Sequence, residues 1–183
     1  MNALKNVGPV VLVVLLSACG SSKSYFTTDV RSRVEKSSVS VQQLQFYIDR
    51  NVELRREVTS KDTKVTSGKV KLVDGKYVNI IVLKKNTPGV CTGFYSGSLN
   101  IAFEKGDGEY LSFGIPNNSD YTNVYQILGE PWTNGQEKVF YEGNAYYIQP
   151  GGTNAKLLIN KSVIDKTGVK SRTMKGRTLD SKD

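Results

Sequence analysis

The sequence contains no histidine among its 183 residues. A Ser-His-Asp triad and a Cys-His pair both use an imidazole as the base, so neither mechanism is open to this chain. The usual nitrogen ligands of zinc are missing for the same reason. Most familiar hydrolase and metalloenzyme designs are therefore excluded, and we expect neither a metal site nor a cofactor.

Long apolar runs are also scarce, and the one that stands out lies near the start of the chain, from Val10 to Leu16. It comes after a single positive charge at Lys5 and is followed by small residues up to Cys19, which is the layout of a signal peptide. A membrane-spanning helix needs about 20 apolar residues. This short run therefore predicts a cleaved leader rather than a permanent transmembrane helix.

The end of the leader, Leu16-Ser17-Ala18-Cys19, resembles the lipobox of bacterial lipoproteins. The resemblance implies cleavage before Cys19, a diacylglycerol on its thiol and usually a further acyl chain, such as palmitate, on its amine. Two or three chains would anchor the protein to a membrane. Gly20 stands where an aspartate would retain a lipoprotein in the inner membrane, so in a Gram-negative cell the resemblance implies the periplasmic face of the outer membrane. An ordinary secretory leader with a chance cysteine is the alternative.

Removal of the leader, residues 1–18, leaves 165 residues, a length that suits one domain. We expect residues 19–27 to form the lipidated cysteine and a flexible polar tether. Residues 28–162 are expected to form a β domain, and residues 163–183 a polar, basic tail or an edge strand.

The mature chain is moderately basic. It carries 24 Lys and Arg against 17 Asp and Glu, because Lys5 is the only charged residue of the leader. Outside the cytoplasm, this excess would meet lipid headgroups, lipopolysaccharide or acidic glycans, and no nucleic-acid partner is expected. A solvated polar tail explains the same charges without any partner.

β-forming segments separated by turn residues dominate the chain from residue 44 onward. Asp74-Gly75 and Glu142-Gly143-Asn144 each predict a tight hairpin, and Asn86-Thr87-Pro88-Gly89 predicts a turn with Gly89 in the left-handed conformation. Strands are expected at residues 44–48, 52–58, 68–73, 77–83, 90–95, 99–104, 109–115, 124–128, 138–141, 145–148 and 156–159. The sequence therefore predicts an all-β fold, an antiparallel small barrel or sandwich of roughly 7 to 10 strands.

One short helix is expected near the start of the domain, with Thr28 or Asp29 as its N-cap and with Val30 and Val34 on one face. Cys91 is the only cysteine besides the one assigned to the lipid, so no internal disulfide can form. We expect Cys91 to be a small packing residue in a strand.

Carboxylate chemistry, as in glycosidases, needs no histidine and stays open. No pair of acids stands out, so a non-catalytic protein is the prediction. The segment Glu104–Glu109 holds three carboxylates, but Lys105 opposes a cation there, and a solvated β-turn explains the segment better than a calcium site. The candidate acids are Asp49, Glu53, Glu57, Glu104, Asp107, Glu109, Glu130, Glu137 and Glu142.

Aromatic residues are the best candidates for a contact surface, with ten tyrosines and one tryptophan in the chain. Trp132, Tyr146, Tyr147 and Tyr121 are the predicted binding residues, because exposed aromatic rings form platforms for glycans or partner proteins. Adjacent strand residues point to opposite faces, so one of Tyr146 and Tyr147 should face outward.

Three functional hypotheses follow. The leading one is a lipid-anchored, non-catalytic envelope protein that binds a protein or another cell-envelope partner through its β domain. The second is a carrier of a small ligand or glycan that uses the interior of a β-barrel. The third is a carboxylate-dependent hydrolase that acts on envelope glycans.

Overall fold

The computed structural model describes residues 22–58, 68–106, 108–116, 123–132 and 135–167. The expected leader, the lipidation site Cys19, the candidate binding residue Tyr121 and the end of the predicted tail lie outside these residues.

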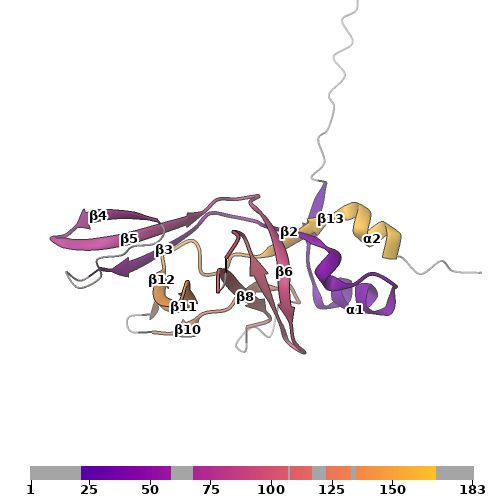
Figure 1. The fold of residues 1–183 in the computed structure, drawn as a ribbon. Helices are drawn as coiled ribbons and strands as arrows, with labels where there is room; N and C mark the ends of the chain where they lie inside the picture. Colours follow the sequence, from indigo (N-terminus) through magenta and orange to yellow (C-terminus); the bar gives the residue numbers. More distant parts are fainter. Residues whose placement is uncertain (1–21, 59–67, 107, 117–122, 133–134, 168–183) are drawn as a thin grey trace, which may run out of the picture.

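Two antiparallel sheets form the domain, with two helices beside them (Figure 1). The first sheet contains, in order across it, β1 (Lys23–Tyr25), β13 (Leu157–Asn160), β2 (Gln45–Ile48), β6 (Pro88–Phe94), β7 (Ser98–Ala102), β8 (Tyr110–Gly114) and β9 (Gln126–Ile127). The second sheet contains β10 (Glu130–Pro131), β11 (Glu137–Tyr141), β12 (Asn144–Ile148), β3 (Val52–Glu57), β5 (Lys76–Leu83) and β4 (Lys69–Val73). The predicted all-β antiparallel fold is confirmed, and its form is sandwich-like, with no closed barrel among the described residues.

The described strands number 13, more than the roughly 7 to 10 expected. The two strands with no counterpart among the expected segments are β1 and β10, which have three and two residues, whereas β9 lies within the expected strand 124–128. Strands this short leave no alternating pattern in the sequence, because two residues cannot show a period of two.

The chain passes between the sheets at four corners, and two of them, β9 to β10 and β12 to β13, lie in the second half of the chain. β2 leads into β3 through residues 49–51, and β5 leads back into β6. Side chains stabilise the first corner, because Asp49 accepts a hydrogen bond from the backbone N–H of Lys156 (2.8 Å) and Asn51 accepts one from the backbone N–H of Lys85 (2.8 Å). The two sheets are therefore joined through continuous chain and share one core.

Both predicted hairpins are present and have the expected geometry. Asp74 and Gly75 have φ angles of 49° and 76°, and Glu142 and Gly143 have φ angles of 51° and 69°. Positive φ at both central residues is the type I′ turn, whose twist matches that of the flanking strands.

The turn before β6 forms differently from the expectation. Asn86 takes the left-handed conformation, with φ of 65°, and Gly89 lies within β6. A Cβ on Gly89 would come within 2.7 Å of the Ile101 side chain and of the Phe103 ring. The prediction for Gly89 is therefore wrong, and this glycine is needed for close packing against β7 rather than for a turn.

The core lies between the sheets and follows the alternation within each strand. Phe46 and Ile48 of β2, Val52 and Leu54 of β3, and Tyr146 of β12 are buried at alternate positions. Phe26 packs its ring edgewise against the rings of Phe46 and Tyr125, with centroid distances of 5.2 and 5.0 Å. Such contacts fill the core on the inner face of the first sheet.

The ends of the predicted domain extend further than expected. β1 pairs with β13 inside the segment assigned to the tether, so the ordered domain begins by Lys23 at the latest. The expected helix is α1 (Thr28–Lys36), but its N-cap is Thr27, whose hydroxyl accepts from the N–H of Val30.

A second helix, α2 (Lys161–Thr167), begins directly after β13 and lies beside α1. The sequence predicted a tail or an edge strand from residue 163, and this is wrong for residues 163–167. Val163 and Ile164 pack against the core, yet two apolar residues in seven are too few to show the helical period of 3.6.

Candidate functional site

Four outward-facing side chains gather on the second sheet: Trp132, Lys138, Phe140 and Tyr147. We call this set the aromatic patch. Val139 and Tyr141 of β11 are buried. Because successive strand residues point to opposite faces, Lys138 and Phe140 point outward. The register pairs Lys138 with Tyr147 of β12, and directly paired residues share a face. Trp132 follows β10, whose Glu130 pairs with Lys138.

The rings of the aromatic patch are close but not parallel. The ring centroids of Trp132 and Tyr147 lie 5.8 Å apart at an interplanar angle of 44°. The amine of Lys138 lies 4.8 Å from the centroid of Trp132 and 5.1 Å from that of Phe140. Trp132 is 44% exposed and Phe140 is 56% exposed, so both present apolar surface to solvent.

Lys138 organises the aromatic patch. Its side chain is only 16% exposed, its amine lies close to the rings of Trp132 and Phe140, and its Nζ lies 2.9 Å from Glu130 Oε2. Contact of a cation with ring faces is favourable. One amine therefore contacts Trp132, Phe140 and Glu130 at once, and side chains that are already in contact lose less entropy when a partner binds.

The structure brings together two of the four predicted binding residues, Trp132 and Tyr147. Tyr146 is fully buried, so its assignment to a contact surface is wrong. Its hydroxyl accepts a hydrogen bond from Asn79 Nδ2 at 3.2 Å, and burial raises the pKa of this phenol. The expectation that one residue of the Tyr146-Tyr147 pair faces outward is confirmed, and Tyr147 is that residue.

Sequence reasoning missed Lys138 and Phe140, although a signal for both was present. A two-residue turn at Glu142-Gly143 pairs position 141 with 144 and therefore 138 with 147. Once Tyr147 faces outward, the same pairing places Lys138 and Phe140 on its face.

A hollow of about 490 Å³ lies next to the aromatic patch. It separates β8 from β10 and β11, and Tyr110, Leu128, Lys138 and Phe140 are among the residues that line it. The patch is therefore part of a contoured surface that has room for a side chain of a partner.

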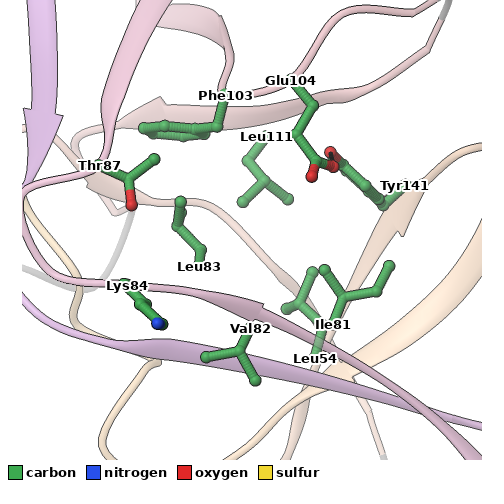
Figure 2. A pocket seen from close by; sticks show the side chains of 10 residues that line it. All are labelled: Leu54, Ile81, Val82, Leu83, Lys84, Thr87, Phe103, Glu104, Leu111 and Tyr141. Carbon is green, nitrogen blue, oxygen red and sulfur yellow. Dashed lines mark hydrogen bonds between the residues drawn. The ribbon is translucent and has the colours of Figure 1, made fainter. Parts of the chain in front are cut away.

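A separate cavity of about 200 Å³ lies between the two sheets (Figure 2). Its walls are mainly apolar and include Leu54, Ile81, Leu83, Phe103 and Leu111. At one end the hydroxyl of Tyr141 donates to Glu104 Oε2 at 2.7 Å, and Lys84 and Thr87 lie toward the other end. Burial and this hydrogen bond raise the pKa of Tyr141, so the phenol stays protonated and remains a donor.

At least four of the nine candidate acids form ion pairs, including Glu130 with Lys138. Glu53 contacts Arg55 at 2.6 Å, Glu57 contacts Lys76 at 2.7 Å, and Asp49 contacts Arg50 at 3.2 Å. Within the described ranges, no group of three or more acidic or cysteine side chains is placed to hold a metal ion. Asp107 of the Glu104–Glu109 segment lies outside the described residues.

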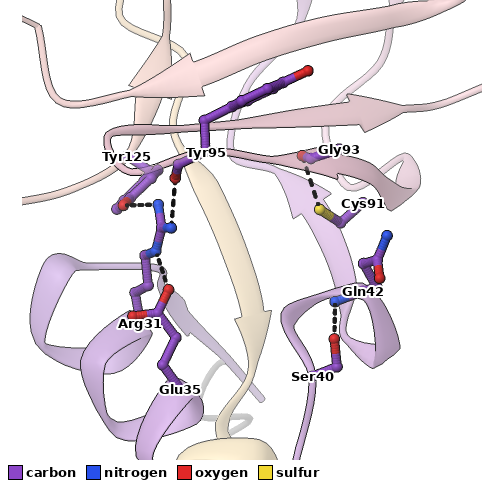
Figure 3. Close-up of polar contacts among 8 residues, drawn as sticks. All are labelled: Arg31, Glu35, Ser40, Gln42, Cys91, Gly93, Tyr95 and Tyr125. Atoms are coloured by element: carbon purple, nitrogen blue, oxygen red, sulfur yellow. Dashed lines mark hydrogen bonds and ion pairs between the residues drawn. The ribbon is translucent and has the colours of Figure 1, made fainter.

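Buried polar contacts attach α1 to the first sheet (Figure 3). Arg31 donates from Nη1 to the hydroxyl of Tyr125 (2.8 Å), from Nη2 to the carbonyl of Tyr95 (2.6 Å) and from Nε to Glu35 (2.6 Å). Burial alone would lower the pKa of Arg31, but the hydrogen bonds to Glu35 and Tyr125 raise it overall. The network satisfies the guanidinium, and we assign it a structural role.

Cys91 is buried in β6, as expected, and its thiol donates to the carbonyl of Gly93 at 3.2 Å. Burial raises the pKa of this thiol, and the thiolate is the reactive form.

We expect iodoacetamide to modify Cys91 at least about tenfold more slowly in the folded protein than in urea. The matched control exchanges the neighbours, Cys91→Ser with Thr92→Cys, and should react rapidly because position 92 is exposed. Equal rates at the two positions would contradict the assignment.

Neither described helix has the length and apolar character needed to cross a bilayer. No protein-family model, curated protein or solved structure matches this chain.

Proposed function

We propose that this chain is an envelope lipoprotein, anchored by lipid on Cys19, whose β domain binds a partner without catalysis. Support for the anchor comes from the order of a charge at Lys5, a short apolar run and the segment Leu16-Ser17-Ala18-Cys19. In the Gram-negative case the domain works at the periplasmic face of the outer membrane. The lipid supplies the location, and the β domain supplies recognition.

The aromatic patch is the single observation that carries the binding role. Tryptophan and tyrosine are the residue types that most often dominate binding energy, and they do so where the surface is already organised. Here the amine of Lys138 already contacts Trp132 and Phe140, beside a hollow that can admit a side chain.

We infer a protein partner rather than a glycan. A sugar ring stacks on a flat, open ring face, whereas Trp132 and Tyr147 are tilted by 44° and the amine of Lys138 lies over Trp132. A contoured surface with an aromatic centre and a charged neighbour is typical of protein interfaces.

The test starts with a photo-crosslinking amino acid at position 140 of the full chain in its own cells, which should yield an adduct with one polypeptide. Binding of that polypeptide is then measured with purified proteins. Trp132→Ala with Tyr147→Ala should weaken the affinity by about 30-fold or more, because even one hot-spot residue contributes about 2 kcal/mol, which is about 30-fold.

The matched control changes two exposed aromatic residues elsewhere, Tyr25→Ala with Tyr95→Ala, and should leave the affinity within about twofold. A glycan adduct at position 140 would contradict the proposed class of partner. Equal losses in the two variants would show that the aromatic patch is not the contact surface.

A small-ligand carrier is the second candidate, favoured by the apolar cavity between the sheets. Its volume of about 200 Å³ is below the range of about 300 to 1,000 Å³ that holds drug-sized ligands, so only a small molecule would fit. A small molecule retained in native mass spectra of the protein, and lost on Leu111→Trp, would favour this role over the first. The carboxylate-dependent hydrolase stays a prediction with no further support.

A further inference from the structure

The β4–β5 hairpin forms an arm that projects from one end of the molecule, opposite the end that carries α1 and α2 (Figure 1). β4 is the last strand of the second sheet, and among the described residues it pairs only with β5. The aromatic patch lies toward the other edge of the same sheet, at β10 to β12. The arm itself lies beyond β3, and its surface adjoins the aromatic patch where Tyr147 of β12 pairs with Arg55 of β3.

The outer edge of β4 presents backbone groups that can accept another strand. Val58 donates its N–H to the carbonyl of Tyr77 at 2.8 Å, so the backbone of Tyr77 faces β3. Leu72 is paired with Tyr77. In an antiparallel ladder, the backbone groups of two paired residues either both point at each other or both point away. Since the backbone groups of Tyr77 point toward β3, Leu72 and Tyr77 make no hydrogen bond to each other. The N–H and C=O of Leu72, and by the two-residue period those of Val70, therefore point away from β5.

Side chains on the two faces of β4 differ in character. Val70 and Leu72 share one face with Tyr77, and Leu72 is 66% exposed and Tyr77 61% exposed, an unusual exposure for large apolar residues. Lys69 and Lys71 lie on the opposite face and line a hollow of about 620 Å³. We call it the basic hollow.

The basic hollow carries an excess of positive charge. Lys69, Lys71, Lys84 and Arg55 line it, against the two acids Glu53 and Glu104. Arg55 is already matched by Glu53 at 2.6 Å. A strand added to β4 would place alternate side chains over this hollow, and acidic side chains complement it.

These features argue against two other occupants. A second copy paired antiparallel through β4 and centred on Val70 or Lys71 would set lysine against lysine, and like charges directly opposite are destabilising. A register centred on Leu72 avoids this, but it places Lys69 opposite Gly75 of the turn and so leaves only a short pairing. A membrane would leave the open backbone edge of β4 without hydrogen-bond partners. The lysines would also point away from the lipid in contact with Leu72 and Tyr77.

We propose that the β4 edge binds an extended segment of a partner polypeptide in which acidic and apolar residues alternate. The backbone of the segment pairs with Val70 and Leu72, its acidic side chains lie over Lys69 and Lys71, and its apolar side chains continue the row of Val70, Leu72 and Tyr77. This is strand addition at a sheet edge, in which backbone hydrogen bonds give affinity and alternate side chains give specificity.

The test uses the full chain purified in detergent and an acetylated eight-residue peptide of alternating glutamate and valine. Residue-resolved hydrogen exchange should show the amides of Val70 and Leu72 slowed at least about tenfold by the peptide. The amides of Lys69 and Lys71 should change little, because they already pair with β5. A peptide with lysine in place of glutamate should bind at least about tenfold more weakly.

Two pairs of variants separate charge from backbone pairing. Lys69→Glu with Lys71→Glu should reduce affinity at least about tenfold, whereas Lys36→Glu with Lys166→Glu, at the far end of the molecule, should not. Val70→Pro removes the outward N–H and should abolish binding, whereas Val70→Thr keeps it and should bind.

Unchanged exchange at Val70 and Leu72 with saturating peptide would overturn the proposal. Equal binding of the lysine peptide would also overturn it, as would protection of these amides by anionic vesicles alone or by raising the protein concentration without peptide. None of these results bears on the aromatic patch, so the two proposals fail independently.

Discussion

Cys19→Ala is expected to release the protein from the membrane, with a fall of about 100-fold or more in the ratio of membrane-bound to soluble protein. Each buried methylene contributes about 0.8 kcal/mol, and a single acyl chain gives only marginal attachment, so two or three chains determine where the protein is found. The apolar run from Val10 to Leu16 is too short to replace them. The measurement is membrane fractionation after a high-salt wash.

Cys91→Ser is the matched control for Cys19→Ala because it removes the other thiol of the chain. It should leave the protein in the membrane fraction. If Cys19→Ala stayed in the membrane as fully as Cys91→Ser, the anchor would have to lie elsewhere.

Tyr146→Ala is expected to reduce the free energy of unfolding by about 4 kcal/mol, comparable to other large-to-small changes of buried aromatic residues. Tyr146 is fully buried, and its removal would leave a cavity and take the hydrogen-bond acceptor from Asn79. Tyr146→Phe keeps the ring and should cost about 1 to 2 kcal/mol through the lost hydroxyl alone. Urea denaturation measures both changes.

Tyr147→Ala is the matched control, because the two tyrosines are adjacent and face opposite sides of β12. Its effect on the free energy of unfolding should stay within about 1 kcal/mol. The pair of variants also separates fold from function, since Tyr147→Ala should weaken partner binding while the domain stays folded. Equal destabilisation by the two changes would contradict the assignment of faces.

The local structure of this protein is well predicted from sequence because its strands and turns follow short-range rules. The expected hairpins at Asp74-Gly75 and Glu142-Gly143 have positive φ at both turn residues. The alternation of Tyr146 and Tyr147 predicts that one of them faces outward, but it does not say which, because that depends on what the other sheet contributes to the core.

Features that depend on contacts between distant residues could not be predicted. The pairing of β12 with β3 joins Tyr147 to Arg55, and the cavity brings Glu104 to Tyr141, which is 37 residues away. Asn86 and Gly89 show the same limit within a turn, because the close packing of Ile101 and Phe103 against Gly89 is a contact with distant residues that the turn sequence does not reveal. Helix α2 was missed because two apolar residues carry too little periodicity.

The intact mass of the native protein, extracted from its own envelope, tests the central proposal most directly. The account predicts a mature chain that begins at Cys19 and carries the mass of a diacylglycerol and usually a further acyl chain. A mature chain with an unmodified Cys19 thiol would contradict it, and the membrane location and the envelope partner would have to be abandoned together.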